Sequence, residues 1–294
     1  MLGKTSKIVL SAVLGLGMVT GAQAQSNEPV RIGWTAWSDA EFVTKLAKDV
    51  IENRLDRDVE LVQTDIAPQY QGVANGDIDV MMMSWQPGTH ADYLDKVNSD
   101  GVKAINLGLL YGYARLGWAV PNYIPKSELN SIEDLKKDSV REKLDGTITG
   151  IDPGAGLTRL SKKTIEDYGL DDYNLQTSSG AGMTAALDRA VKRDNWIVVT
   201  AWSPHWLFGA YDMRYLKDPK GTLGSYERIH AFANVGFYQR DPEVAMFLSR
   251  MQIPLDDLEA AMYDAQQTSY EKAVQKYIDN NKARIDYWVT GDVK

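Results

Sequence analysis

Cysteine is absent from this 294-residue chain, and histidine occurs only three times. The chain can therefore form no disulfide, thiol nucleophile or cysteine-ligated metal centre, and the three histidines are not at metal-ligand spacing. A G-x-S-x-G turn, a G-K-[ST] phosphate loop and an H-E-x-x-H motif are also missing. We therefore expect no catalytic group, no metal and no cofactor.

Long apolar runs are equally scarce, with one exception at the N-terminus. Lys4 and Lys7 precede a largely apolar stretch over 8–20, and the small-x-small triplet 22–24 follows it. This pattern predicts a cleaved secretion signal over residues 1–24; a retained N-terminal anchor is the alternative. No other stretch approaches the roughly 18 apolar residues that span a bilayer. We expect an exported protein of a bacterial periplasm.

The charge balance is acidic, with a formal net charge of −8. An acidic chain is a poor partner for nucleic acids and for anionic membrane surfaces, so we expect neither. Most of the aromatic residues are of the types that carry a polar atom, with eight Trp and fifteen Tyr against five Phe. Rings with one polar edge suit surfaces that meet a polar ligand.

Short apolar runs alternate with amphipathic helical patterns, which is typical of an α/β fold. Ser38 and Glu41 match a capping box at the start of the first helix. Two strand–helix sets favour two lobes, which we expect over 25–112 plus 213–294 and over 113–212. The expected strands cover 30–34, 59–63, 80–84, 147–151, 196–202 and 229–237, and the expected helices begin near 38, 68, 157 and 181.

Three tryptophans share one setting. Trp37, Trp85 and Trp202 each lie at or just past the end of an apolar run. Ligands of open α/β sheets bind outside the carboxyl ends of the strands, so these indoles can converge on one crevice. Indole faces attract cations, and a methylated ammonium loses little hydration on entering such a site. The alternative is that all three are ordinary core residues.

An anion site is also possible. Gly156 and Leu157 open a predicted helix, where free N–H groups and the helix dipole favour a carboxylate. His90 follows Trp85 closely and could add a donor. Both features have plainer explanations, namely a tight strand-to-helix connection and a structural histidine. The G-x-G-x-x-A pattern over 180–185 follows a weak strand, so dinucleotide binding is disfavoured.

Four segments make the chain resemble the substrate-binding proteins of ABC importers for quaternary ammonium compounds. They are Ala36–Asp39, Gly76–His90, Gly150–Gly156 and Val198–Trp206, with a further match over 211–220. The resemblance implies a type II-like periplasmic binding fold, in which two α/β lobes joined by a hinge close on the ligand.

The resemblance also implies roles for individual residues. It places an aromatic box for the trimethylammonium group on Trp37, Trp85 and Trp202. Glycine betaine binders of the family hold the carboxylate with glycine-loop amides and a histidine, which implies Gly156, Leu157 and His90 here. Choline binders use an aspartate two residues after the first box tryptophan, which matches Asp39, and a fourth, tyrosine wall. That wall has no clear counterpart among Tyr111, Tyr113 and Leu116.

The expected function is that of a monomeric periplasmic receptor for glycine betaine or a related trimethylammonium zwitterion. Such a receptor delivers its ligand to a membrane permease. Two alternatives stay open at this point. One is a choline or carnitine receptor of the same fold, and the other is an exported enzyme acting on an ammonium compound.

Overall fold

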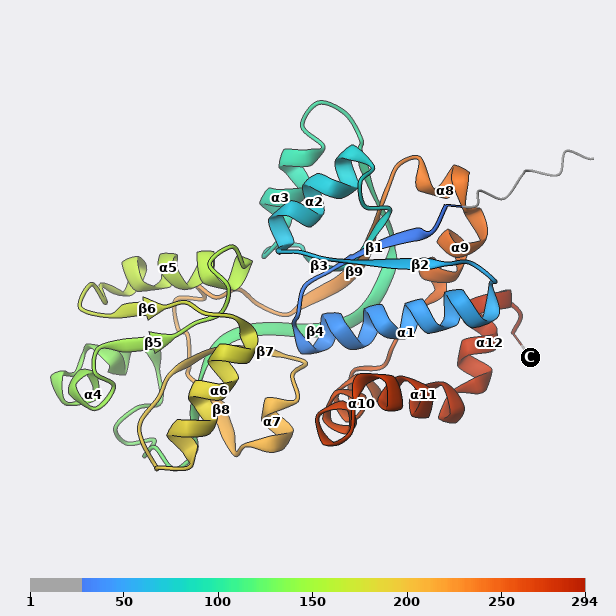
Figure 1. Ribbon diagram of the computed structural model, residues 1–294. Helices are drawn as coiled ribbons and strands as arrows, with labels where there is room; N and C mark the ends of the chain where they lie inside the picture. Colours follow the sequence, from blue (N-terminus) through green and yellow to red (C-terminus); the bar gives the residue numbers. More distant parts are fainter. Residues whose placement is uncertain (1–27, 294) are drawn as a thin grey trace, which may run out of the picture.

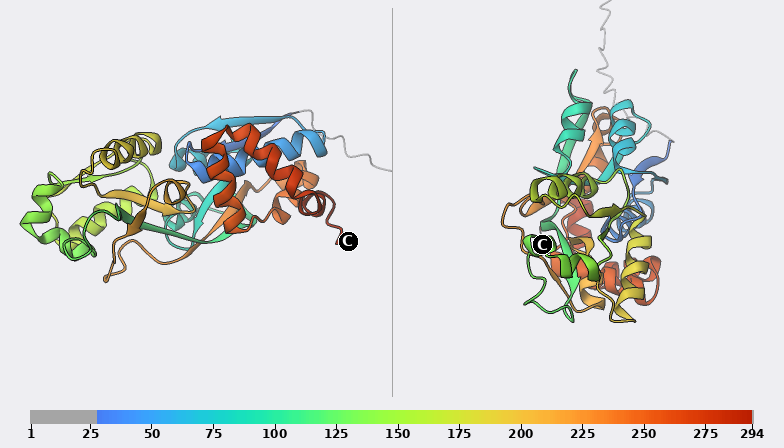
Figure 2. Two further views of the ribbon diagram at one scale, coloured as in Figure 1. Left: turned by 90° about the horizontal axis from the view of Figure 1, so that it is seen from below. Right: turned by 90° about the vertical axis from the view of Figure 1, so that its left-hand side faces the viewer.

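The computed structural model describes residues 28–293, and the expected secretion signal over 1–24 lies outside them. Two groups of helices and strands lie side by side along the long axis of the molecule (Figures 1 and 2). We call them the β1 lobe and the β7 lobe after a strand of each. Among the described helices, none is both long and apolar enough to cross a membrane.

The sheet order β2-β1-β3-β9-β4-β7-β5-β6 runs through both lobes, with β8 added to β4. β4 (Ala104–Pro121) is the shared strand. Its first part pairs antiparallel with β9 (Glu227–Asn234), and its second part pairs antiparallel with β7 (Val199–Ser203). The register shifts between Tyr111 and Ala114, where Tyr113 has a positive φ of 58°. The strand is therefore irregular where it passes from one lobe to the other.

The β1 lobe contains parallel strands β1 (Val30–Trp34), β2 (Val59–Gln63) and β3 (Val80–Gln86). All residues of β3 except Gln86 are buried, as expected for a strand covered on both faces. The helices of this lobe are α1 (Ser38–Arg54), α2 (Ile66–Asn75), α3 (Ala91–Val97), α8 (Phe237–Arg240), α9 (Pro242–Arg250), α10 (Leu255–Gln267), α11 (Tyr270–Asn280) and α12 (Lys282–Thr290).

The β7 lobe contains β5 (Thr147–Thr149), which runs parallel to β6 (Asn174–Gln176) and to β7. Trp118 of β4 is fully buried in its core and donates its indole N–H to Ser161 at 2.9 Å. The remaining elements are the 3-10 helix Ile132–Lys136, α4 (Asp138–Lys143), α5 (Gly156–Tyr168), α6 (Gly180–Val191), α7 (Leu207–Ala210) and β8 (Met213–Tyr215).

The α/β prediction is confirmed, and the six expected strands are present: β1 and β2 have the expected bounds, and β3, β5, β7 and β9 differ at their ends. The capping-box prediction is wrong. The N-cap of α1 is Trp37, whose side chain accepts no capping bond, and Ser38 is already the first helical residue. Asp39 and Glu41 still place acidic groups in the first turn, where the helix dipole favours negative charge. β4 was missed as a strand because Gly108, Gly112 and Gly117 interrupt its apolar pattern.

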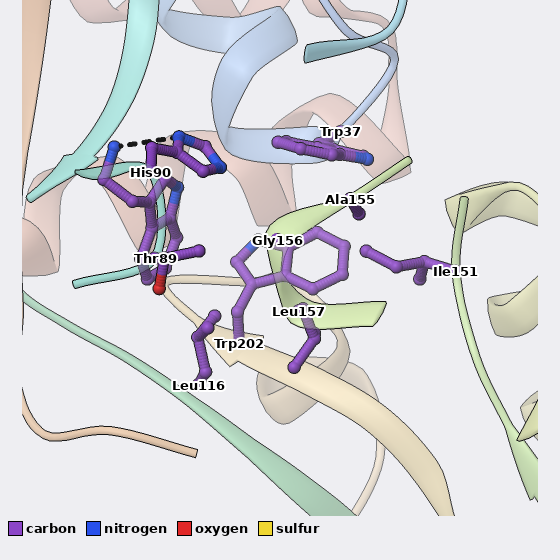
Figure 3. A pocket seen from close by; sticks show the side chains of 10 residues that line it. Trp37, Thr89, His90, Leu116, Ile151, Ala155, Gly156, Leu157 and Trp202 are labelled. Atoms are coloured by element: carbon purple, nitrogen blue, oxygen red, sulfur yellow. Dashed lines mark hydrogen bonds between the residues drawn. The ribbon is translucent and has the colours of Figure 1, made fainter. Parts of the chain in front are cut away.

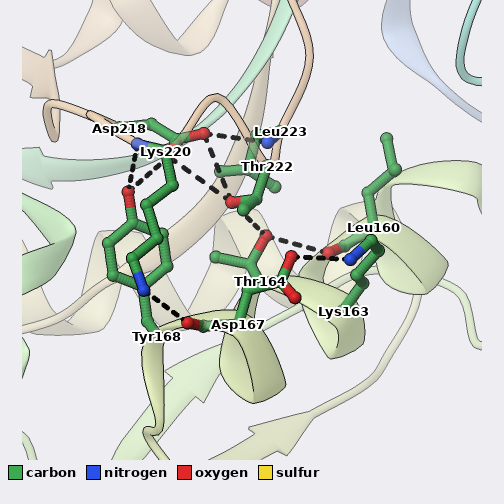
Figure 4. Close-up of polar contacts among 9 residues, drawn as sticks. All are labelled: Leu160, Lys163, Thr164, Asp167, Tyr168, Asp218, Lys220, Thr222 and Leu223. Carbon is green, nitrogen blue, oxygen red and sulfur yellow. Dashed lines mark hydrogen bonds and ion pairs between the residues drawn. The ribbon is translucent and has the colours of Figure 1, made fainter.

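The return segment after β8 belongs to the β7 lobe. β8 pairs with β4, and Lys217 bridges to Ser131. Beyond it, Asp218 accepts hydrogen bonds from the Tyr168 hydroxyl of α5 at 2.6 Å and from the Leu223 amide at 2.8 Å (Figure 4). We therefore propose that the chain crosses back between Leu223 and Glu227, later than the expected boundary near 212. The other crossing, near 112, stays a prediction.

Two glycines of β4 provide a test of packing in this shared strand. A Cβ at Gly117 would lie within 2.7 Å of the Tyr215 ring, which a hydrogen bond to Ser203 holds in place. At Gly112 a Cβ would meet only the Arg228 side chain, at 3.9 Å. Gly117→Ala should lower the free energy of unfolding in urea by about 1–3 kcal/mol. Gly112→Ala is the control, and an equal effect of both substitutions would contradict this packing.

Candidate ligand-binding site

The three tryptophans converge on one cavity between the lobes (Figure 3). Trp37 lies between β1 and α1, Trp85 near the end of β3, and Trp202 near the end of β7. The space in this cavity that is open to the centre of a water-sized sphere measures about 20 Å³. Its walls are formed by Trp37, Trp85, Thr89, His90, Leu116, Ile151, Ala155, Gly156, Leu157 and Trp202.

We call Trp37, Trp85 and Trp202 the tryptophan box. All three are buried, with exposed fractions of 7%, 3% and 3%. The rings of Trp37 and Trp202 lie 6.2 Å apart between centroids and are tilted by 57°. Because one ring comes from the β1 lobe and the other from the β7 lobe, the box is complete only when the lobes are together. The structure shows this closed arrangement.

His90 lies at the edge of the box as a neutral donor. Its Nδ1 accepts a hydrogen bond from the Trp85 amide at 3.1 Å, and its own amide donates to the Trp85 carbonyl at 3.0 Å. Burial lowers the pKa of His90 to about 3, against a smaller opposite effect of the Met83 carbonyl. A neutral ring that accepts at Nδ1 carries its proton on Nε2. The Cδ2 edge next to that nitrogen faces Gly156.

The N-terminus of α5 forms the other polar part of the cavity wall. Its N-cap is Ala155, which offers no side-chain acceptor. Within residues 28–293, neither the Gly156 amide nor the Leu157 amide has an acceptor. A Cβ at Gly156 would lie 2.9 Å from the Thr89 carbonyl oxygen and 3.1 Å from His90. Only glycine therefore allows α5 to approach the Thr89–His90 turn this closely.

Asp39 lies behind the tryptophan box and does not line the cavity. It is fully buried, and its carboxylate accepts hydrogen bonds from the Tyr111 hydroxyl at 2.7 Å and from Trp202 Nε1 at 3.1 Å. Burial raises the pKa of Asp39, and these two hydrogen bonds oppose that shift. Among the three candidates for a fourth wall, Leu116 alone lines the cavity, while Tyr111 is buried against Asp39 and Tyr113 is 76% exposed.

Sequence reasoning missed the groups that join the lobes around the cavity. Trp37 donates its indole N–H to Asp152 at 2.9 Å. Arg159 of α5 donates to the Thr89 carbonyl at 3.0 Å, and the Tyr93 hydroxyl of α3 donates to the Gly154 carbonyl at 3.0 Å. These partners are distant in sequence, so their contacts could not be predicted. Only Asp152 lies in a segment that the sequence singled out, the Gly150–Gly156 motif.

Glu227, the first residue of β9, was also missed. Its buried carboxylate accepts from the Thr89 amide at 3.1 Å and from the Thr89 hydroxyl at 2.5 Å. The Gly88 amide donates to the same carboxylate at 3.3 Å. Glu227 therefore fixes the turn that carries His90 to the sheet of the β1 lobe.

Comparison with known proteins identifies the class to which this fold and cavity belong. The family model described as the substrate-binding domain of ABC-type glycine betaine transport systems matches residues 28–280, so the chain belongs to that family. A glycine betaine/carnitine transport binding protein of Listeria monocytogenes is 39% identical over 161 residues, which cover 54% of this chain and 53% of that protein. The match thus spans about half of that relative's length.

Two solved structures are similar over most of their length. Lactococcal OpuAC, in its closed conformation with glycine betaine, is 35% identical with a TM-score of 0.80 and covers 90% of this chain and all of its own. The glycine betaine/L-proline-binding protein of Borrelia burgdorferi is 29% identical with a TM-score of 0.82, covering 89% of this chain and 97% of its own. The two-lobed fold expected from the sequence is confirmed.

Buried histidines make the stability depend on pH. Burial lowers the pKa of His90 and of His205 to about 3, below the 6.5 of an exposed imidazole. As pH falls below about 6.5 the unfolded chain takes up protons that the folded chain refuses, so the folded state loses stability. The free energy of unfolding should fall by about 1.4 kcal/mol per pH unit for each histidine.

Urea unfolding of the wild type and of His205→Gln between pH 4 and pH 6 measures this effect. The free energy of unfolding of the variant should depend less steeply on pH, and the difference in slope should correspond to the uptake of about one proton. His230→Gln is the comparison: burial also lowers the pKa of His230, but this side chain is only partly buried and bonds to Asn106, so the slope should change by less. Identical slopes for wild type and His205→Gln would contradict the prediction.

Proposed function

We propose that this chain is a receptor that captures glycine betaine, or a closely related trimethylammonium zwitterion, in the cavity between its lobes. It then delivers the ligand to the permease of an ABC importer. The observation that carries the proposal is the joint lining of one buried cavity by the tryptophan box and by the amide end of α5. The two parts have opposite electrostatic character, as the two ends of a zwitterion require.

The tryptophan box is the cation end. A trimethylammonium group donates no conventional hydrogen bond, so it loses little hydration free energy on leaving water. The faces of Trp37, Trp85 and Trp202 then attract its positive charge. Cation–π contacts contribute about 0.5–1 kcal/mol when exposed and roughly 2 kcal/mol or more when dry. The low exposure of all three rings supports the value for a dry site.

The anion end has three donors. The Gly156 and Leu157 amides point out of the first turn of α5, and the N-terminal dipole of the helix favours negative charge there. His90 adds its Nε2 proton as a neutral donor. A carboxylate that accepts from all three gains charge-assisted hydrogen bonds, which are stronger than bonds between neutral groups.

Binding without chemistry fits the cavity lining. Among the lining residues, the Thr89 hydroxyl donates to Glu227, and the His90 imidazole accepts a hydrogen bond from a backbone amide at Nδ1. The Thr89 hydroxyl is bonded to a carboxylate, but that carboxylate also accepts from the Gly88 and Thr89 amides, so we infer that the pair holds the turn and does not activate a nucleophile. We infer that the chain is not an enzyme, and that it acts in the periplasm as a monomer after removal of residues 1–24.

Choline is the second candidate, and Asp39 is the observation that favours it. The carboxylate of Asp39 lies behind Trp202, however, and not on the cavity wall. Choline would leave the α5 amides without an anionic acceptor. We therefore favour a carboxylate-bearing ligand over an alcohol.

Glycine betaine should bind more tightly than choline, because only its carboxylate uses the donors at α5 and His90. His90→Ala should weaken glycine betaine binding by roughly tenfold or more, the loss expected for one charge-assisted bond, and choline binding by less. Calorimetric titration of both ligands on wild type and variant measures this difference. His90→Gln, which keeps a donor, should recover part of the loss. Tighter choline binding by the wild type, or equal losses for both ligands in His90→Ala, would show that the anion end is wrongly assigned.

Closure should depend on the missing side chain at Gly156. In Gly156→Ala the new methyl group would collide with Thr89 and His90 of the other lobe, while the helix itself gains a better helix former. We expect an unchanged melting temperature but a loss of affinity of at least tenfold, since closing against backbone costs more than about 1.4 kcal/mol.

Small-angle scattering gives the conformational readout for this variant. The radius of gyration of the wild type should fall on saturation with glycine betaine, and that of Gly156→Ala should not. Gly180→Ala, at the first residue of α6, is the comparison at the tryptophan box itself: its Cβ would meet Trp37 and Trp202 only at ordinary contact distances of 3.6 Å and 3.9 Å, so closure should be retained. Normal affinity in Gly156→Ala would overturn the role given to this close approach.

A further inference from the structure

Two walls of the tryptophan box are bonded to carboxylates of the opposite lobe. Trp202 of the β7 lobe donates its indole N–H to Asp39 of α1, in the β1 lobe, at 3.1 Å. Trp37, at the start of α1, donates its indole N–H to Asp152, which follows β5 in the β7 lobe, at 2.9 Å. We call these two contacts the crossed indole–carboxylate bonds.

Asp39 is a buried carboxylate without a cation. Its exposed fraction is zero, and it forms no salt bridge with any side chain in residues 28–293. Its partners are neutral donors, the Tyr111 hydroxyl and the Trp202 indole, together with amides of the first turn of α1. A buried charge is normally paired, so the protein alone leaves this one electrostatically incomplete.

We propose that Asp39 and Asp152 are positioning residues that make the tryptophan box select a positively charged head group over a neutral group of the same shape. The inference rests on the proposed function and deepens it. Neither carboxylate lines the cavity, so both act through the indoles that they hold.

The physical basis has two parts. An indole N–H that donates to a carboxylate makes its ring richer in electrons, which strengthens the negative potential of the face turned to the ligand. Burial raises the pKa of Asp39, and a cation in the box would favour its ionised form; the charge of that form acts across the Trp202 ring in a dry surrounding, where charges are poorly screened. Asp39 should contribute more than Asp152, because Asp152 is only partly buried.

The same bonds couple charge selection to closure. Each bond joins one lobe to the other, so each indole gains its carboxylate partner only when the lobes meet. The box therefore reaches its full negative potential in the closed form. A neutral head group would gain the contact area of that form without the electrostatic attraction.

The test compares glycine betaine with 3,3-dimethylbutanoate, which replaces the ammonium nitrogen by carbon and keeps the carboxylate. Dissociation constants of both compounds are measured for wild type, Asp39→Asn and Asp152→Asn, by direct titration and by competition. The ratio of the two constants isolates the charge of the head group. Asp39→Asn should lower the preference for glycine betaine by roughly tenfold, and Asp152→Asn by less.

Glu41→Gln is the matched control. It removes a carboxylate from the same first turn of α1, but Glu41 pairs with Lys45 and holds no indole. Its ratio should equal that of the wild type. Equal weakening of both compounds in Asp39→Asn would mean that Asp39 only shapes the box, which would overturn the inference.

Indole resonances in ¹H–¹⁵N spectra give a readout that needs no affinity for the neutral compound. The Nε1–H signal of Trp202 should shift in Asp39→Asn and that of Trp37 in Asp152→Asn, with glycine betaine bound in each case. Unmoved signals would contradict the crossed bonds. A wild type that binds no trimethylammonium compound would instead contradict the proposed function itself.

Discussion

The polar edges of the indoles are the constraint on which this site depends. A cation box of tryptophans must expose ring faces to the cavity, and its buried N–H groups then need acceptors behind the walls. Here the acceptors for Trp202 and Trp37 are Asp39 and Asp152, each supplied by the other lobe. The indole N–H groups of Trp202 and Trp37 therefore gain their acceptors only when the lobes close. With the lobes apart, the tryptophan box is incomplete and these two hydrogen bonds are absent.

This arrangement distributes charge in a way that matches a zwitterion. Behind one end of the cavity lies the carboxylate of Asp39 without a countercharge, and at the other end lie the free amides of Gly156 and Leu157. His90 stays neutral because burial lowers its pKa to about 3, so it donates without adding a positive charge beside the cation end. A ligand with separated charges completes both ends together, whereas a simple cation completes only one.

The sequence predicted which residues of the proposed site would meet at the strand ends. Trp37, Trp85 and Trp202 could be found because each follows a strand, and strand ends meet at one edge of an α/β sheet. The partners that orient them could not be found in this way. Asp39 and Trp202 are 163 residues apart, and Glu227 is 138 residues from Thr89, so only the folded chain brings them together. The capping box expected at Ser38 fails because the helix begins at Ser38 itself, with Trp37 at the N-cap and no side-chain capping bond.

Each half of the site is held by hydrogen bonds within its own lobe, which bears on how the lobes can close. Glu227 fixes the Thr89–His90 turn to β9, so the histidine moves with the β1 lobe. Asp218 and Tyr168 tie the return segment to α5 (Figure 4), and α5 also contacts β7, so the Gly156–Leu157 amides belong to the same lobe as Trp202. We propose that the irregular part of β4 near Tyr113 and the segment between Leu223 and Glu227 are the connections between these bodies. Rotation about those two connections can therefore separate or join the two halves of the site without distorting either half, and the ligand's affinity then reports the free energy of bringing the halves together.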